Sequence, residues 1–582
     1  MLSIGYKKLS KANIDLCLPS LSPERYQNSS LAAALGLCGR VGLKFSGLLG
    51  FLQGDDNQTE LQPRYQRTQP SYARERWKIS MSVQASESIS DVLEPDNEKR
   101  MNQGIEEDAE RVREAGFEEP EGLTAGVETE YFIVDGNDQP ISEDKRDELI
   151  GKGEETEDLE NWDHELGASM AETASDPVRD IQDLGKLEAA IEEPEEEMLR
   201  RLEGTEYQLI RSGTNPNQDL DEVKRTNKPK YIEVPDAYGK MRKRNVENED
   251  LEFSEDLGIE RITSEFGSKD TVDPQNEDLP ATISSTQLNV QAKDMDDAIE
   301  KANIGYAIAP YITALSGNSR FVDGKDLGYS DARVELWEKA FDIGNFEKDD
   351  IDIGKLDEYF QDFGDYIKRM KEQPRIVNDE SRKTIDEDVS EAVEDIPLDV
   401  GQGMYWKDSR IKVIDELRVK DELIVEFRQN STQPTAAEDT AIHAFYLGRM
   451  AYEQEQDSDL LDIEKVNQNR YQAMRNSLDA KLYDWETGEL ADAEDVLESE
   501  LEKASEGLRE AGIKDPGYID ILEERLDQRL TPSDEVAEIY SERLQDQQNF
   551  DGNDYSEAKQ KAAMDAVKEV NMTDYKQRMQ GV

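Results

Sequence analysis

Two glutamates lie two residues apart in the segment GVETEYFIVD, residues 126–135. The alternation in this segment predicts a strand, and residues i and i+2 of a strand point to the same side, so Glu128 and Glu130 share one face. Adjacent carboxylates repel each other unless a cation lies between them. Hard oxygen ligands of this kind suit Mg²⁺, which completes its shell with water and phosphate oxygens. In an acidic chain, the same spacing is also typical of a solvated strand face.

A carboxylate and a guanidinium have the same spacing in the later segment IVEFRQNSTQPT, where Glu426 and Arg428 share a strand face. An exposed ion pair of this type would contribute only ~0–1 kcal/mol to stability. Beside a magnesium-phosphate site, the glutamate would hold the metal and the arginine would grip a transferring phosphoryl group with two hydrogen bonds.

Cysteine and histidine chemistry is nearly excluded by composition. Cys17 and Cys38 are the only cysteines, and His164 and His443 are the only histidines. Beyond residue 80 there is no thiol for a disulfide, a nucleophile or a metal site. His164 precedes Glu165, and it would either orient that carboxylate or serve as a surface or capping residue. The apolar neighbours of His443 on a predicted helix favour a place in the core.

The net charge is −64, from 133 acidic and 69 basic residues, yet 36% of the chain is hydrophobic. The acidic residues are spread along the chain, which favours a surface adapted to concentrated salt over an acidic docking arm, because salt screens self-repulsion. A disordered acidic chain would share this charge, but strand and helix patterns persist throughout. Nucleic acid is not expected as a partner, since phosphate binding requires clustered Lys and Arg.

The first 80 residues differ from the remainder in charge. They carry eleven Lys and Arg against six Asp and Glu, a net of +5. The apolar stretch 30–52 is interrupted by Arg40 and Lys44, so it is a poor membrane-spanning candidate. We expect Met81 to be the natural start and residues 1–80 to be a spurious or disordered basic extension.

The positions of these groups depend on the elements that carry them. Strands separated by single helices and loops, without regular alternation, predict an α+β fold with an antiparallel sheet. Residues 136–162 are expected to be a loop, and residues 217–280 show no clear pattern. The helix at 294–316 should be capped by Asp294. The expected strands are 126–135, 165–177, 207–216, 281–292, 409–419 and 421–430; the expected helices are 94–116, 184–204, 294–316, 436–454 and a helical region to 582.

Five segments occur in the order found in the glutamate-cysteine ligase family, notably its plant-like and bacterial type-2 branches, over roughly residues 120–450. ALSGNSRF, residues 314–321, followed by GYSDAR is the most distinctive part of this resemblance. The five segments are GVETEYFIVD, ELGASMAET, SGTNP, the long stretch from STQLNVQ to GYSDAR, and VEFRQNSTQPT.

The resemblance implies a glutamine synthetase-like fold, in which a curved antiparallel sheet forms a funnel with helices packed outside. It also implies ATP and Mg²⁺ as cofactors. Arg428 matches the family's arginine near the γ-phosphate, and Arg333 matches a position near substrate and phosphates. Gln287, on a strand that departs from the family pattern, and Asn289 match the cofactor-binding strand. The matched metal ligands are Glu128, Glu130, Glu165, Glu172 and Glu426.

The expected function is therefore the ATP-dependent joining of the glutamate γ-carboxylate to the amine of cysteine, through an acyl phosphate. A related ligase that uses another amine, or a non-catalytic nucleotide-binding relative, stays open as an alternative. We expect a ligase core at 81–450, a helical region at 451–582, a cytoplasmic location, small-molecule substrates and no membrane partner. The sequence does not indicate an oligomeric state.

Overall fold

The computed structural model describes residues 95–117, 119–152, 159, 161–228, 231–239, 262–263, 271–272, 276–341, 353–373, 397–414, 422–456, 459–546 and 553–572. The predictions for residues 1–80 lie outside these ranges. Among the described helices, none is long and apolar enough to cross a membrane.

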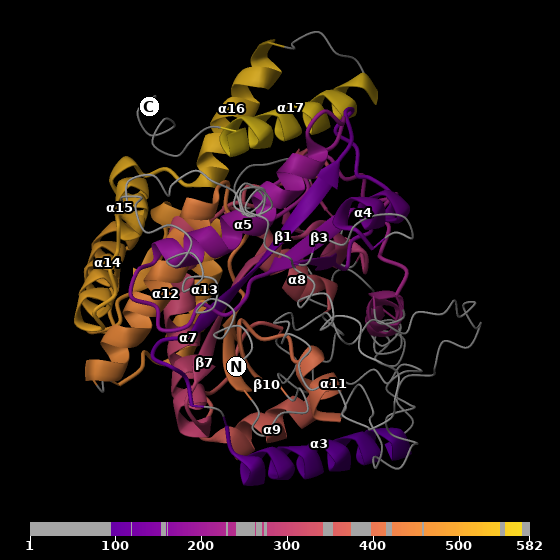
Figure 1. Ribbon diagram of the computed structural model, residues 1–582. Coiled ribbons are helices and arrows are strands. Elements are labelled where there is room, and N and C mark those ends of the chain that lie inside the picture. Colours follow the sequence, from indigo (N-terminus) through magenta and orange to yellow (C-terminus); the bar gives the residue numbers. More distant parts are fainter. Residues whose placement is uncertain are drawn as a thin grey trace, which may run out of the picture. The chain divides into compact units, whose positions relative to one another are not determined.

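An antiparallel sheet forms the centre of the fold (Figure 1). In the described part of the chain it contains seven strands, six of them in one continuous order and the seventh, β4 Gln208–Ile210, paired with β1. The order is β10 Ser409–Ile414, β11 Glu422–Phe427, β7 Thr286–Ala292, β1 Ala125–Val134, β3 Met170–Ala174 and β2 Trp162–His164.

The strand alternation gives this sheet two different faces. Across the β7, β11 and β10 ladder, Val290 lies opposite Val425, which lies opposite Ile411, and all three are buried in the largest apolar cluster. This apolar face packs against α5 Gly185–Leu202 and α7 Met295–Ser316, with α12 Ala436–Gln456 packed against both helices. Glu128 and Glu130 on β1 and Glu426 on β11 lie on the other face, because they occupy the alternate positions.

Helix α7 approaches the sheet closely at one glycine. A Cβ atom on Gly305 would lie 2.2 Å from the Phe427 ring, so any larger residue there would push α7 away from β11. The side chain of Asp294 accepts a hydrogen bond from the backbone of Asp297, which confirms the predicted cap. The register of β11, which carries Glu426, is therefore supported from behind by a close helix contact.

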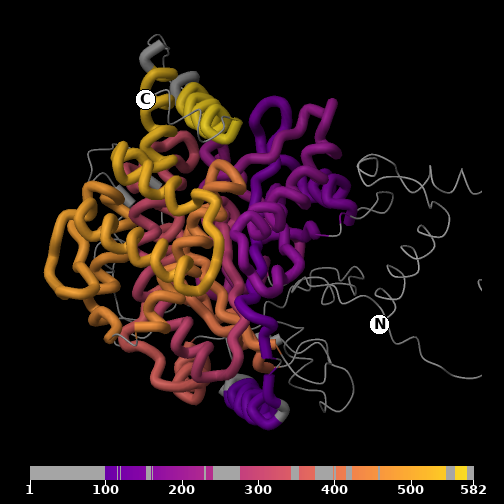
Figure 2. Tube along the Cα trace, turned by 60° about the vertical axis from the view of Figure 1, so that its left-hand side comes forward, coloured from indigo at the N-terminus to yellow at the C-terminus, as the bar shows by residue number. Residues whose placement is uncertain are grey.

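Further helices surround this core. Near β10 lie α3 Pro95–Ala115, α9 Phe363–Glu372 and α11 Pro397–Gly403, which pack against one another. The C-terminal helices are α13 Ile463–Asn476, α14 Ala493–Glu510, α15 Tyr518–Gln528, α16 Pro532–Asp546 and α17 Asn553–Met572. Figure 2 shows α16 and α17 side by side in yellow. Their apolar side chains pack against Phe132 and Val134 at the end of β1.

Three expectations about local structure are corrected. The expected loop at 136–162 contains α4 Glu143–Ile150, capped by Ser142, and the start of β2. The helical C-terminal region also contains a hairpin, formed by β12 Lys481–Tyr483 and β13 Leu490–Asp492. The strand expected from residue 165 begins at Met170, so Glu165 lies in the preceding loop. Helix α4 carries local signals of its own, since Ser142 caps its start and Gly151 ends it in the left-handed conformation. Strands of three residues, such as β2, β12 and β13, are too short to show a clear local pattern.

The predicted α+β class, with an antiparallel sheet and helices packed outside it, is confirmed. The proposed division near residue 450 stays a prediction. Much of 217–280 lies outside the described residues; within this range, the structure describes the short strands β5 Ile262–Thr263 and β6 Thr271–Val272. Between β7 and β10 lie strands β8 Phe321–Val322 and β9 Lys325–Asp326 and helix α8 Ala332–Ala340.

His443 on α12 makes the stability of this core sensitive to acid. Its ring is buried, with Nε2 3.2 Å from the Thr286 hydroxyl, and burial lowers its pKa to about 3. The unfolded chain takes up this proton near pH 6.5, so the histidine's contribution is complete above that pH and is lost as the pH falls toward 3. The free energy of unfolding should therefore fall by about 2 kcal/mol between pH 7 and pH 5 because of His443.

We therefore expect His443→Gln to lose about 2 kcal/mol less stability than the wild type between pH 7 and pH 5, measured by denaturant unfolding at constant salt. Phe445→Leu, two residues along the same buried helix, is the matched control. It should lower stability by the same amount at both pH values. Equal acid sensitivity of His443→Gln and wild type would contradict the assignment.

Candidate active site

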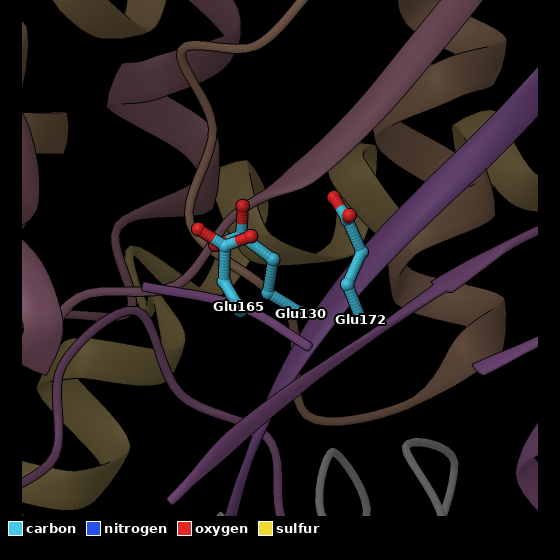
Figure 3. Close-up of side chains that lie close together, drawn as sticks. All are labelled: Glu130, Glu165 and Glu172. Carbon is cyan, nitrogen blue, oxygen red and sulfur yellow. The ribbon is translucent and has the colours of Figure 1, made fainter. Parts of the chain in front are cut away.

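Three glutamates converge on the polar face of the sheet (Figure 3). Glu130 on β1 lies directly opposite Glu172 on β3, and Glu165 reaches them from the loop before β3. Each offers a carboxylate oxygen, and these oxygens lie within 4.8 Å of one another. We call these three residues the acidic trio. Their separation allows a single cation to be held between them.

The electrostatics of the acidic trio favour a bound cation. Burial, followed by the charge of Glu165, raises the pKa of Glu130 to about 8. Burial and the neighbouring glutamates raise the pKa of Glu172 well above its ordinary value. Among the described residues, no Lys or Arg lies within ion-pair distance of any of the three, whereas carboxylate oxygens are the ligands that Mg²⁺ prefers. The donor set fits the metal that the family resemblance implies.

Hydrogen bonds hold the acidic trio in place. Glu130 accepts one from the backbone N–H of Ser285 at 2.7 Å and another from the Gln287 side-chain amide at 3.0 Å. The backbone carbonyl of Glu165 accepts a hydrogen bond of 2.5 Å from Thr226, whose hydroxyl also accepts one from the buried Arg146. The loop that carries Glu165 is thus tied to a segment some sixty residues away.

The other two glutamates lie toward β10 and β11 and are compensated differently. Glu426 is fully buried and lies opposite Arg410, whose guanidinium donates to both of its oxygens. Lys412 also contacts Glu426 and lies 3.9 Å from Glu128. Burial would raise the pKa of Glu426, but Arg410, Lys412 and Arg428 outweigh burial and hold it far below its ordinary value.

Guanidinium groups gather beside these carboxylates. Arg428 follows β11, stacks 5.9 Å from the Trp337 ring, and its buried Nη1 atom has no hydrogen-bond partner in the described part of the chain. Arg333, on α8, donates to the Gln429 carbonyl at 2.9 Å, while its Nε atom has no such partner among those residues. Burial and, for Arg428, the adjacent Arg410 lower the pKa of both arginines. Crowded cations with orphaned donors favour an anionic ligand.

The structure brings together the site residues predicted from the sequence on one face of the sheet. Glu130, Glu165 and Glu172 form the acidic trio, whereas Glu128 and Glu426 lie beside Lys412. Gln287 and Asn289 on β7 donate to Glu130 and Glu128, at 3.0 and 3.1 Å. In this structure both amides therefore support carboxylates.

Arg410 and Lys412 also lie in this site, and neither was predicted from the sequence. Their i, i+2 spacing in SRIKVID places them on one face of a strand, by the same rule that identified Glu128 and Glu130. That spacing gave a signal, but only the pairing of β10 with β11 puts Arg410 opposite Glu426.

His164 does not contact Glu165 in this structure. Its Nδ1 atom lies 2.6 Å from Asp163 and its Nε2 atom 3.3 Å from Asp147, and Lys228 lies 3.0 Å from Nδ1. The mostly buried ring belongs to a polar cluster at the start of β2. Trp337 and Trp406 pack in an aromatic cluster with Phe341.

Comparison with known families gives the class of this fold and site. The model of glutamate-cysteine ligase family 2 matches residues 124–560, which include every strand of the main sheet. The chain belongs to this family.

Among individual relatives, the glutamate–cysteine ligase of Haloferax volcanii is 26% identical over 249 residues, which cover 40% of this chain and 58% of the relative. The chloroplastic glutamate–cysteine ligase of Nicotiana tabacum is 25% identical over 279 residues, 45% of this chain and 50% of the relative. The chain thus spans about half the length of these curated relatives. A solved Francisella tularensis glutamate–cysteine ligase in complex with AMP has 11% identity and a TM-score of 0.46, covering 80% of this chain and 92% of that one; similarity this low says nothing about the site.

Divalent metal should stabilise the folded chain through the acidic trio. At a free Mn²⁺ concentration about 100 times the dissociation constant, binding to the native state adds about 2.7 kcal/mol. In ~2 M KCl, which screens weak surface binding, we expect Mn²⁺ to raise the wild-type thermal midpoint. Glu172→Gln should remove this increase. Glu196→Gln, on the exposed face of α5, is the control and should keep it. An unchanged increase in Glu172→Gln would place the metal elsewhere.

Proposed function

We propose that this chain is an ATP-dependent carboxylate-amine ligase that joins the γ-carboxylate of glutamate to an amine, with cysteine as the preferred amine. The observation that supports this most strongly is that the acidic trio and two buried arginines lie close together in one site. The charges of Arg333 and Arg428 are near enough to lower the pKa of Glu130, against the larger effect of burial, although neither arginine forms an ion pair with it in the described part of the chain. A metal-binding carboxylate group beside buried arginines is the arrangement that phosphoryl transfer from a nucleotide requires.

The proposed reaction has two steps. The γ-carboxylate of glutamate attacks the γ-phosphorus of ATP, so that ADP leaves and an acyl phosphate forms. The amine then attacks the acyl carbon, phosphate leaves with the bonding electrons, and the nitrogen loses a proton to give a γ-glutamyl amide. Activation is needed because a free carboxylate is a poor electrophile.

Each group of side chains has a part in these steps. Glu130, Glu165 and Glu172 would hold Mg²⁺, which neutralises phosphate oxygens when it is bound. Arg428 and Arg333 would direct at the transferring phosphoryl group the N–H groups that have no hydrogen-bond partner among the described residues, and would stabilise its charge. Gln287 would keep Glu130 in position through its hydrogen bond. Positioning and charge neutralisation supply most of the rate in this chemistry, so the site requires neither histidine nor cysteine.

Arg428→Lys tests the phosphoryl-transfer role. Lysine keeps the charge but lacks the planar fork of the guanidinium, so turnover should fall by about 10³ or more while the fold is retained. The rate would be measured as ADP formation with saturating ATP, Mg²⁺, glutamate and cysteine. Arg543→Lys is the control. Arg543 on α16 forms a half-exposed ion pair with Glu569 on α17, so this substitution should leave turnover unchanged. Wild-type turnover in Arg428→Lys would remove this arginine from the mechanism.

The overall activity is tested by phosphate release from ATP in ~2 M KCl with glutamate and a panel of primary amines. We expect release to require glutamate, Mg²⁺ and an amine together, with the highest kcat/KM for cysteine. A higher value for another amine would indicate a related ligase. The absence of release with every amine, from a protein that still binds ATP, would favour a non-catalytic nucleotide-binding relative.

A further inference from the structure

The side chain of Lys412 lies between two buried carboxylates on the polar face of the sheet. Its ammonium contacts the Oε1 atom of Glu426 and lies 3.9 Å from the Oε1 atom of Glu128. The three residues come from three strands, since Lys412 is on β10, Glu426 on β11 and Glu128 on β1. A cation that bridges two carboxylates from different strands occupies the place that a metal ion would take.

The ammonium of Lys412 reaches Glu426 across the strand pair. Its register partner on β11 is Ile424, a buried apolar residue, so the contact with Glu426 is diagonal. Diagonal neighbours on one face lie within reach of a long side chain. The lysine side chain is only 15% exposed, so its charge is held inside the site instead of in solvent.

Both oxygens of Glu426 are already engaged. Arg410 donates from Nε to Oε2 and from Nη2 to Oε1, the latter at 3.2 Å, and Lys412 shares Oε1. Glu128 in turn accepts a hydrogen bond of 3.1 Å from Asn289 on the same Oε1 atom that faces the lysine. A Mg²⁺ ion needs about 2.0–2.1 Å to its oxygens, so it could bridge these two carboxylates only if the ammonium left.

The acidic trio differs in this respect. Glu130 and Glu172 lie on neighbouring strands, and no Lys or Arg of the described chain lies within ion-pair distance of them or of Glu165. The polar face thus carries two sets of glutamates. Lys412 lies between Glu128 and Glu426, whereas the acidic trio has no Lys or Arg within ion-pair distance in the described chain.

We propose that Lys412 is a built-in cation that closes the Glu128–Glu426 pair to divalent metal, so that the acidic trio alone supplies the metal site of the nucleotide-free protein. This inference rests on the proposed function for the role of the trio. It revises the expectation from the sequence that all five glutamates bind metal. Lys412 is then a positioning residue, which holds Glu426 and, through it, the neighbouring Arg428.

Counting bound Mn²⁺ tests this proposal without any turnover. Free Mn²⁺ would be measured by electron paramagnetic resonance in ~2 M KCl without nucleotide, using the full chain. We expect Lys412→Met to bind one more Mn²⁺ per chain than the wild type. Adding Glu426→Gln to Lys412→Met should return the count to the wild-type value. Lys412→Arg, which keeps the positive charge, is the matched control and should show the wild-type count.

Two results would overturn the proposal. One is an equal Mn²⁺ count in Lys412→Met and wild type, and the other is the loss of an ion from the wild-type protein on Glu426→Gln alone. Lys412→Gln provides a second neutral variant, so a poorly folded Lys412→Met protein does not decide the outcome. Failure of the proposed function would appear separately, as absent phosphate release by the wild type, and would leave the Mn²⁺ counts unaffected.

Discussion

The repulsion between buried carboxylates is the constraint on which this site depends. Five glutamates meet on one face of an antiparallel sheet, and a buried negative charge without compensation is strongly unfavourable. The protein compensates Glu426 with Arg410 and Lys412, in contacts it makes on folding. It leaves the acidic trio without such partners in the described chain, and the raised pKa values of Glu130 and Glu172 record the resulting cost. A divalent cation bound between these carboxylates would relieve their repulsion.

The other face of the sheet sets the positions of these charges. Because side chains alternate along a strand, a slip of one residue would move Glu128 and Glu130 into the apolar core and bring Val127 and Thr129 into the site. Packing of Val290 and Val425 against α7, with the close approach at Gly305, opposes such a slip. Apolar contacts on the opposite face of the same sheet therefore fix the positions of the charged groups.

Several parts of this arrangement could be predicted from the sequence. The strong alternation in 126–135 and 424–428 placed Glu128, Glu130 and Glu426 on strand faces, since a period of two is a local property, whereas Arg428 lies just beyond the end of β11. The ligase family and the α+β class were also predicted, from five ordered segments and the spacing of the elements.

The remaining features depend on contacts between distant segments. Glu165 lies in a loop that Thr226 and Arg146 hold in place, and a local pattern carries no information about either partner. Arg410 and Lys412 were visible as a pair on one strand face, but their roles depend on which strand lies beside β10. Spacing gives the face of a residue, whereas register and long-range pairing decide which charge it meets.

The proposed division of the polar face also suits the composition of the chain. With a net charge of −64, the surface attracts cations of every kind, and the excess of acidic residues predicts operation in concentrated salt. A carboxylate pair exposed to such a solution would exchange among whatever cations are present. The ammonium of Lys412 is part of the neighbouring strand, so its effective concentration beside Glu426 is high and does not change with the solution. Lys412 would thus hold Glu426 in one position and, through their ion pair, Arg428 as well. The acidic trio, which lacks a tethered cation, is then the part of the site that responds to divalent metal.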